Sequence, residues 1–542
     1  MAPRLDSAPA RARLGPLLNT LIVAAGYLAS RVLGLIRDVI ISAQFGTLPA
    51  YGAYRATFNV LDLIYVVVAG GALGSAFIPV FSGMLEEQRG DAAWRLASGL
   101  LNLALIGLVA ACLLIGLLAE PIVAYSIGSG FDAPQRALTV QLLRLMLVQP
   151  LLLGIGGLAK ATLESFDRFS LPAIGANLYN LGIIGGALVL APWLGIYGLV
   201  CGVIAGAALF LLVQLPGLRR VGARYSPGLG LRTPELRRVG RLLAPRLFGQ
   251  AAWQINLIAV GSFASLFGAA AVAANGYALT LMLLPHGLIA LSLGTVIFPQ
   301  LARLHAAGDT AAFRDTAVGA LRSVLFLALP AAAMLAVLAA PAVRVLFERG
   351  RFGADATALT AQALMFYALG LAAFAAAEII VRSFYAMHDT RTPVVVGSAM
   401  VLLNIALGAG FTRVGAGLPG LALAFSIANT AEAATLLLLL ERRLGRLGGA
   451  FWRALGAMLL ATLAAAAALW LARDLSARWL PAILPNPGYR PLADFVPLAL
   501  WLALAGMLGG LVYGGCAWLL GLGEVRALRG RLAAVLRRGR GA

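Results

Sequence analysis

Residues 96–119 read LASGLLNLALIGLVAACLLIGLLA and carry no charged side chain. A helix over this stretch is about 36 Å long, because each residue adds about 1.5 Å, and that length crosses the hydrocarbon core of a bilayer. A helix also pairs its backbone polar groups within the segment, as lipid requires. The stretch is therefore typical of a transmembrane helix.

The rest of the chain has the same character. Of its 542 residues, 61% are hydrophobic and 12% are charged, and the mean hydropathy is +0.90. A soluble domain carries about 25% charged residues, which cover its surface. The composition predicts an all-α polytopic membrane protein of the transporter type and argues against a soluble enzyme.

Apolar runs divide the chain into about fourteen predicted spans. They are 17–44, 56–83, 96–119, 137–163, 170–192, 196–217, 245–268, 273–301, 316–340, 356–386, 392–412, 417–440, 451–472 and 495–520. The predicted organisation is an N-terminal segment that is retained rather than cleaved (1–16), a six-helix lobe (17–217), a basic linker (218–244), a second six-helix lobe (245–440), two additional helices (441–520) and a basic tail (521–542).

The net charge of +20 sets the predicted orientation. Arginines gather in 218–244, 441–453 and 521–542, whereas the connections 193–195 and 269–272 carry no charge. Basic loops stay in the cytoplasm, so both termini are predicted to be cytoplasmic in a bacterial inner membrane. An opposite-side segment departs from this pattern by carrying Arg344, Arg349 and Arg351.

The same distribution bears on partners and cofactors. Because the basic residues border apolar runs, the expected partners are membrane lipids and no nucleic acid. Cys112, Cys201 and Cys516 lie far apart within apolar runs, which gives neither a disulfide framework nor a metal-ligand spacing. No metal and no cofactor is expected.

A short pattern recurs at an offset of about 220 residues, as internal repeats of transporters do. GSAFIP at 74–79 matches GTVIFP at 294–299, Ser165-Phe166 matches Ser383-Phe384, and Gly198-Leu199 matches Gly420-Leu421. Each match occupies the same place in a six-helix unit, which predicts two related lobes with the substrate site between them. The alternative is that Gly, Pro and Phe recur at helix ends in general.

Three charged residues interrupt the first span. Arg31 lies near the middle of its apolar run, where a charge costs several kcal/mol unless it faces a polar cavity. Arg31 and Asp38 share a helix face, because they are two turns apart. Arg31, Arg37 and Asp38 are therefore candidate substrate-binding residues; a structural ion pair, or extension of Arg37 toward the headgroups, is the alternative. Glycines among these charges and in the second span are candidate hinge or packing positions: Gly34, Gly70 and Gly71.

Charges also fall in two other spans. Arg55 opens the second span and is a further substrate-binding candidate, while Asp62 in the same span either couples an ion or balances an arginine. Glu378 and Arg382 are spaced i, i+4, so a local pair is the default for Glu378 and ion coupling is the alternative.

No segment supports catalysis. The polar stretches are too short for a globular catalytic domain, and they contain no P-loop, metal-ligand spacing or nucleophile elbow. The protein is predicted not to be an enzyme, and no catalytic residue is assigned. An interior lined by arginines fits an anionic cargo, because Arg pairs bidentately with phosphate.

At this point the residues resemble the MurJ (MviN) lipid II flippases of the multidrug/oligosaccharidyl-lipid/polysaccharide (MOP) exporter superfamily. The resemblance lies in SRVLG at 30–34 with Arg37-Asp38, AFIP at 76–79 and DRFSLP at 167–172, and it runs over nearly the whole chain. It implies two six-helix lobes plus two helices, and export of the undecaprenyl-pyrophosphate-linked peptidoglycan precursor, lipid II, by alternating access. It also implies that Arg31 and Arg37 line the cargo cavity, and it leaves open a coupling cation and a link to the cell-wall synthesis machinery.

The sequence departs from the family pattern at three positions. Gly52 stands where the family usually has an acidic residue, Tyr65 stands near a usual basic one, and Thr280 stands where an arginine is usual. Arg55 and Asp62 are additional charges. These differences keep two alternatives open: another polyprenyl-linked glycan as the cargo, or a membrane scaffold that does not transport.

Overall fold

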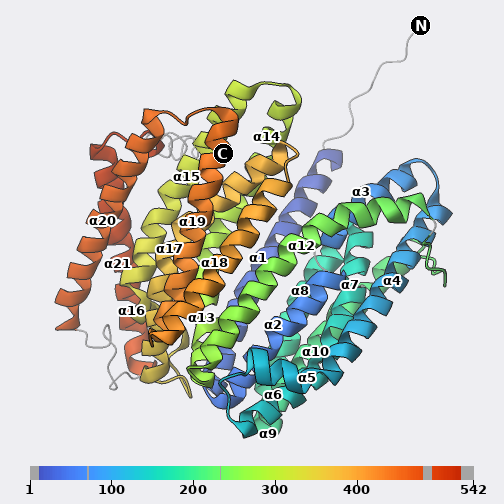
Figure 1. Cartoon of the computed structure of the whole chain (residues 1–542), viewed down its shortest axis with the longest axis horizontal. Coiled ribbons are helices and arrows are strands. Elements are labelled where there is room, and N and C mark those ends of the chain that lie inside the picture. The colour runs from blue at the N-terminus through green and yellow to red at the C-terminus, as the bar shows by residue number, and fades with distance from the viewer. Residues whose placement is uncertain (1–10, 70–71, 232, 480–490, 526–542) are drawn as a thin grey trace. The chain divides into compact units, whose positions relative to one another are not determined.

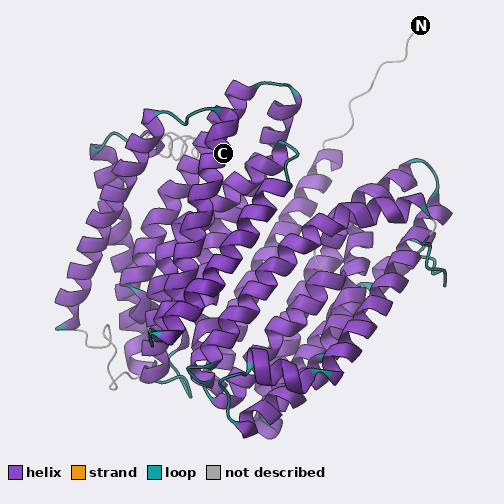
Figure 2. Cartoon of the chain, in the orientation of Figure 1, coloured by secondary structure: helices purple, strands orange, loops and turns teal. Residues whose placement is uncertain are grey.

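The computed structural model describes residues 11–69, 72–231, 233–479 and 491–525, and every regular element in these ranges is a helix (Figure 2). Among the described residues, eleven helical segments are long and apolar enough to cross a membrane: Gly90–Leu117, Ala133–Glu164, Ser170–Leu194, Ile196–Arg220, Ala269–Ala306, Thr310–Val337, Ala354–Ala386, Arg391–Arg413, Gly417–Leu444, Gly449–Ala477 and Ala493–Leu519. The chain is thus an all-helical, multi-pass membrane protein, as its composition predicts.

The chain divides into two compact units. The first contains the described residues up to Gln44, together with Ala53–Gly128 and Asp132–Ile255. Its helices, seen in Figure 1, are α1 (Arg11–Phe45), α2 (Pro49–Ala69), α3 (Ala72–Glu86), α4 (Gly90–Leu117), α5 (Ala119–Ile122), α6 (Ala133–Met146), α7 (Val148–Glu164), α8 (Ser170–Gly185), α9 (Ala191–Leu194), α10 (Ile196–Leu212), α11 (Leu215–Arg220) and the first part of α12 (Pro234–Ser265).

The second unit contains Phe45–Gly52, Ser129–Phe131 and the described residues from Asn256 onward. Its helices are the end of α12, α13 (Ala269–His286), α14 (Ser292–Ala306), α15 (Thr310–Val337), α16 (Ala339–Phe347), α17 (Ala354–Ala386), α18 (Arg391–Arg413), α19 (Gly417–Leu444), α20 (Gly449–Ala477) and α21 (Pro491–Leu519). Single π-helical turns follow α5, α8 and α13, at Val123–Ile127, Gly186–Leu190 and Gly287–Leu291.

Each unit has its own apolar core. In the first unit, Leu236 and Val239 of α12 pack into a cluster with Phe77 and Phe81 of α3. In the second unit, the largest cluster joins α15, α17, α19 and α20. Exposed leucines such as Leu113, at 63% exposure, lie on the outer face of the helices, as expected where lipid replaces water.

Two short loops belong to the second unit although their flanking helices belong to the first. The Tyr277 hydroxyl donates to the carbonyl of Gly46, and the backbone N–H of Gly130 donates to Ser265 Oγ over 3.2 Å. A Cβ on Gly52 would stand 2.5 Å from the carbonyl oxygen of Ala269. The start of α2 therefore approaches the start of α13 so closely that position 52 has no room for a side chain.

Glycine also determines how α8 packs on α10, which lie side by side in Figure 1. A Cβ on Gly202 of α10 would lie 2.7 Å from Gly186 Cα and 2.9 Å from the carbonyl oxygen of Gly182. Small residues let two helix backbones approach closely and gain van der Waals contact, which is the main attraction between helices in lipid.

Replacing Gly182 by leucine should separate α8 from α10, because a Cβ there would overlap the backbone of Gly206. We expect the free energy of unfolding to fall by at least about 1–3 kcal/mol. Gly185→Leu is the matched control on the same helix, since a Cβ there meets open space. Thermal unfolding in detergent, followed by tryptophan fluorescence, compares the two variants, and equal melting temperatures would contradict this packing.

Candidate functional site

A group of charged and amide side chains lies among the helices of the first unit. Its centre is Arg37 on α1, whose Nε donates to Asp38 Oδ1 over 2.9 Å and whose Nη1 donates to Asn180 Oδ1 over 3.1 Å. The Arg37 Nη2 also lies 2.9 Å from Asp38 Oδ1. Asn180, on α8, donates from Nδ2 to the backbone carbonyl of Ser30 over 3.2 Å. Asn180 therefore bonds both the Arg37 side chain and the backbone of α1, which fixes the guanidinium relative to its own helix; we call this pair of contacts the brace.

Gly34 of α1 lies beside Asn180. A Cβ at Gly34 would lie 3.9 Å from Asn180 Oδ1, so the glycine sits directly under the amide that receives the arginine. The sequence-based role of Gly34 as a packing position stays a prediction, and the contact is consistent with it. The other two predicted packing glycines, Gly70 and Gly71, lie outside the described residues.

Asp62 on α2 faces the same group. It interacts electrostatically with Arg55 of its own helix and with Arg37 of α1. Tyr65, one turn further along α2, and Tyr179 of α8 also lie within electrostatic range of the Asp62 carboxylate. The Asp62 carboxyl group thus lies within electrostatic range of two guanidinium groups and two phenols.

One buried acceptor of this group stays open. Gln149 of α7 is 3% exposed, and its Nε2 donates to the Tyr179 hydroxyl over 3.0 Å. Its Oε1 has no hydrogen-bond partner among the described residues. Buried polar atoms are nearly always paired, so this oxygen marks a place for a water molecule or a ligand.

Arg31 differs from Arg37 in having no partner among the described residues. Its side chain is exposed, and it makes no hydrogen bond or ion pair with any residue that the structure describes. Asp38, which shares a helix face with Arg31 by spacing, pairs with its neighbour Arg37 instead. The Arg31 guanidinium, which has no described counter-charge, therefore lies about one and a half helical turns from the paired Arg37 guanidinium.

The three positions that lack the usual family charges have different surroundings. Gly52 is closed off by Ala269, as described above. Tyr65 contributes a phenol near Asp62, and Thr280 donates its hydroxyl to the carbonyl of Gly276 within α13. Arg55, half-buried on α2, is an additional cation of the first unit, with Asp62 as its electrostatic partner.

Two carboxylates of the second unit lie inside apolar helices. Glu378 pairs with Arg382 on the same helix, with 2.8 Å between Oε1 and Nη2, and Arg382 Nη1 donates to Thr295 Oγ1 over 3.3 Å. The i, i+4 pair predicted from the sequence is therefore present. The second carboxylate, Glu432 of α19, was not predicted as a site residue from the sequence. It faces Gly397 of α18, where a Cβ would stand 3.4 Å from Glu432 Oε1. Glu432 could have been recognised from the sequence, because it is the single acidic residue within the apolar run 417–440.

A charge cluster outside the spans fixes the turn between α17 and α18. Thr392 donates to Asp389 from its backbone N–H and from its hydroxyl, over 3.0 and 2.7 Å, and Arg443 Nη2 lies 2.8 Å from Asp389 Oδ2. Burial alone would raise the pKa of Asp389, but these hydrogen bonds and the arginine outweigh it and lower the pKa. Asp389 thus ties the start of α18 to the end of α19.

Comparison with known proteins identifies relatives along most of the chain. The family model described as "Lipid II flippase MurJ" matches residues 41–487, so Arg31, Arg37 and Asp38 precede the matched range. The Burkholderia cenocepacia protein named "Lipid II flippase MurJ" is 31% identical over 397 residues, which cover 72% of this chain and 77% of that protein. The Haemophilus influenzae "Probable lipid II flippase MurJ" is 29% identical over 518 residues, covering 91% and 98%.

Solved structures share the fold. The structure titled "Lipid II flippase MurJ, inward closed conformation" matches with a TM-score of 0.73 at 23% identity, covering 91% of this chain and 98% of that chain. A multidrug resistance MATE family transporter of the MOP superfamily, in an inward-facing conformation, matches with a TM-score of 0.64 at 14% identity, covering 77% and 95%.

The brace between Arg37 and Asn180 is testable by a double-mutant cycle of Arg37→Ala and Asn180→Ala. A hydrogen bond to a charged group contributes about 1.5–3 kcal/mol, so we expect a coupling of that size in the free energy of unfolding. Chemical denaturation of the purified protein in detergent measures it. Losses that add within about 0.5 kcal/mol would mean that the two side chains do not interact.

Proposed function

The chain belongs to the lipid II flippase MurJ family, and on this premise we propose that it moves lipid II across the bacterial inner membrane for peptidoglycan synthesis. The undecaprenyl-pyrophosphate-linked precursor binds from the cytoplasmic leaflet and leaves into the outer leaflet. The chemistry required is recognition and passage of an anionic headgroup, with no bond made or broken. Its cargo and the membrane lipids are the partners.

The observation that carries the proposal is the contrast between Arg37 and Arg31. Arg37 is held in one orientation by Asp38 and Asn180. Arg31 has no described protein partner, and a guanidinium in a membrane span is costly unless it faces a polar cavity or a counter-charge. A pyrophosphate supplies that counter-charge, because its oxygens accept paired hydrogen bonds from Arg.

Arg55 supplies a second cation for the same cargo. Thr280 donates its hydroxyl within α13 and Tyr65 contributes a phenol, so the basic residues usual in the family at and near these two positions are absent. Arg55 and Asp62 interact on α2, and pyrophosphate competes with Asp62 for Arg55. Asp62 is then the group released for ion coupling, whereas Glu378 is already paired with Arg382.

The proposed membrane arrangement has fourteen spans. The eleven apolar segments are joined by α1, by α2 with α3, and by α12, which gives six-helix lobes at 17–217 and 245–440 and two further helices within 441–520. The basic linker 218–244 and both termini lie in the cytoplasm, following the arginine distribution. Cargo moves as the lobes alternate between inward and outward access, and the membrane potential assists the export of negative charge.

A second cargo has one observation in its favour. The altered charge pattern at Gly52, Tyr65 and Thr280 fits a different headgroup on the same polyprenyl carrier. Another polyprenyl-linked glycan is therefore the alternative cargo.

Expression in a strain depleted of its own lipid II flippase tests the proposal. The wild-type chain should restore growth and cell shape, and Arg31→Ala should abolish rescue at an unchanged protein level in the membrane. Arg413→Ala is the matched control, since Arg413 is also exposed and lacks a described side-chain partner. No rescue by a wild-type chain that reaches the membrane would point to the second cargo. Rescue by Arg31→Ala would remove Arg31 from the site.

A further inference from the structure

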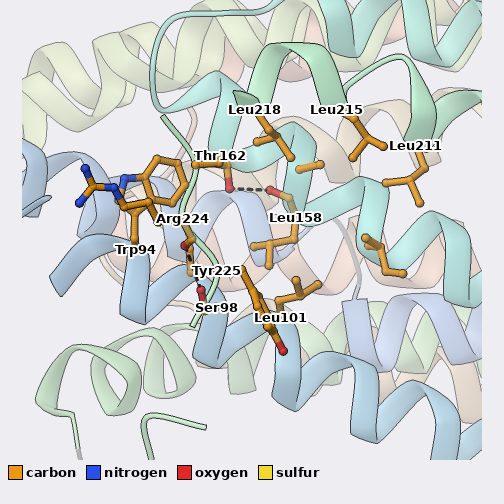
Figure 3. Close-up of a pocket in the computed structure, with 14 residues that line it drawn as sticks. Trp94, Ser98, Leu101, Leu158, Thr162, Leu211, Leu215, Leu218, Arg224 and Tyr225 are labelled. Carbon is orange, nitrogen blue, oxygen red and sulfur yellow. Dashed lines mark hydrogen bonds between the residues drawn. The ribbon is translucent and has the colours of Figure 1, made fainter. Parts of the chain in front are cut away.

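The first unit contains an apolar pocket of about 240 Å³ that lies apart from the charge cluster (Figure 3). Its walls come from α4, α7, the α10–α11 corner and the linker after α11. Figure 3 shows Leu158 beneath Leu215 and Leu218, with Leu101 and Tyr225 on the opposite side. Apolar cavities hold water poorly, so an apolar chain is the natural occupant.

The linker that closes the pocket is fastened to α4. The backbone N–H of Ser226 donates to Ser98 Oγ over 3.0 Å, and Asn102 Nδ2 donates to the carbonyl of Gly228 over 3.0 Å. The Tyr225 hydroxyl donates to Asn102 Oδ1 over 2.9 Å. A Cβ on Gly99 would lie 2.9 Å from the carbonyl oxygen of Leu229, so the linker presses directly on the helix. The wall is thus a fixed part of the first unit.

A basic pocket lies on the other side of the short helix α11. It measures about 300 Å³ and is lined by Arg168, Arg220, the beginning of α8 at Ser170 and one acidic residue, Asp167. The side chains of Arg168 and Arg220 are exposed and have no hydrogen bond or ion pair with a described residue. Two open guanidinium groups and a helix N-terminus favour an anion.

The short helix α11 contributes to both pockets, Leu215 and Leu218 to the apolar one and Gly217 and Arg220 to the basic one. We propose that an anionic phospholipid binds here, with one acyl chain in the apolar pocket and its phosphate between Arg168 and Arg220. A zwitterionic lipid such as phosphatidylcholine carries a cation beside its phosphate and so balances the two arginines less well, and a soluble anion would leave the apolar pocket empty. Basic pockets beside membrane helices on the cytoplasmic side are suited to anionic headgroups.

Binding has a consequence for the linker. The acyl chain contacts Tyr225, whose hydroxyl is bonded to Asn102 of α4, so the bound lipid stabilises the linker in its docked position. The site takes from the proposed function only the orientation that puts this end in the cytoplasmic leaflet. It does not depend on the identity of the transported cargo.

Photolabelling tests the site. The full chain is placed in phosphatidylcholine nanodiscs that contain a trace of phosphatidylglycerol with a diazirine at the end of one acyl chain, and adducts are mapped by mass spectrometry. Peptides with Leu101 and Leu158 should be labelled more than about tenfold better than by the matching phosphatidylcholine probe, because each arginine near the phosphate gives about a fivefold preference.

Matched variants sharpen the test. Ala159→Trp fills the apolar pocket and should abolish labelling, while Ala110→Trp makes the same change on an exposed face of α4 and should leave labelling intact. Arg168→Ala with Arg220→Ala changes exposed residues only and should remove the preference for phosphatidylglycerol; this variant decides the matter if Ala159→Trp does not accumulate. Equal labelling by both probes, labelling of Ala159→Trp, or displacement by undecaprenyl phosphate at a lower concentration than phosphatidylglycerol would each overturn the proposal.

Discussion

A positive charge among apolar helices has to be compensated, and this requirement organises the surroundings of Arg37 in the first unit. Arg37 meets it with Asp38 on its own helix and with Asn180 on α8. Because Asn180 also bonds the backbone at Ser30, the position of α8 along α1 is tied to the orientation of one guanidinium. The glycines between α8 and α10 let α8 pack closely on its other neighbour.

Because Arg37 is already paired, the proposed cargo site rests on Arg31 and Arg55. Arg55 interacts electrostatically with Asp62, and Arg31 has no described partner, so the proposed cargo site offers one free and one exchangeable cation. The close approach of Gly52 to Ala269 explains why a charge is missing there.

Much of this follows from the sequence, because lipid restricts the choices. Apolar runs predict the helices, and the spacing of Glu378 and Arg382 predicts their pair. The partner of Arg37 could not be predicted, since Asn180 is far away along the chain and an asparagine in an apolar run carries no directional signal. The docking of the linker on Ser98 and Asn102 was equally out of reach, because it depends on loop geometry that hydropathy does not encode.

The measurement that bears most directly on the account is equilibrium binding of lipid II to the purified protein in nanodiscs. Arg31→Ala and Arg55→Ala should each weaken binding by at least about tenfold, because a charge-assisted hydrogen bond contributes about 1.5–3 kcal/mol. An analogue with a single phosphate should bind more weakly than lipid II to the wild type and lose less in either variant. Unchanged binding of lipid II in both variants would contradict a cargo site built on these arginines.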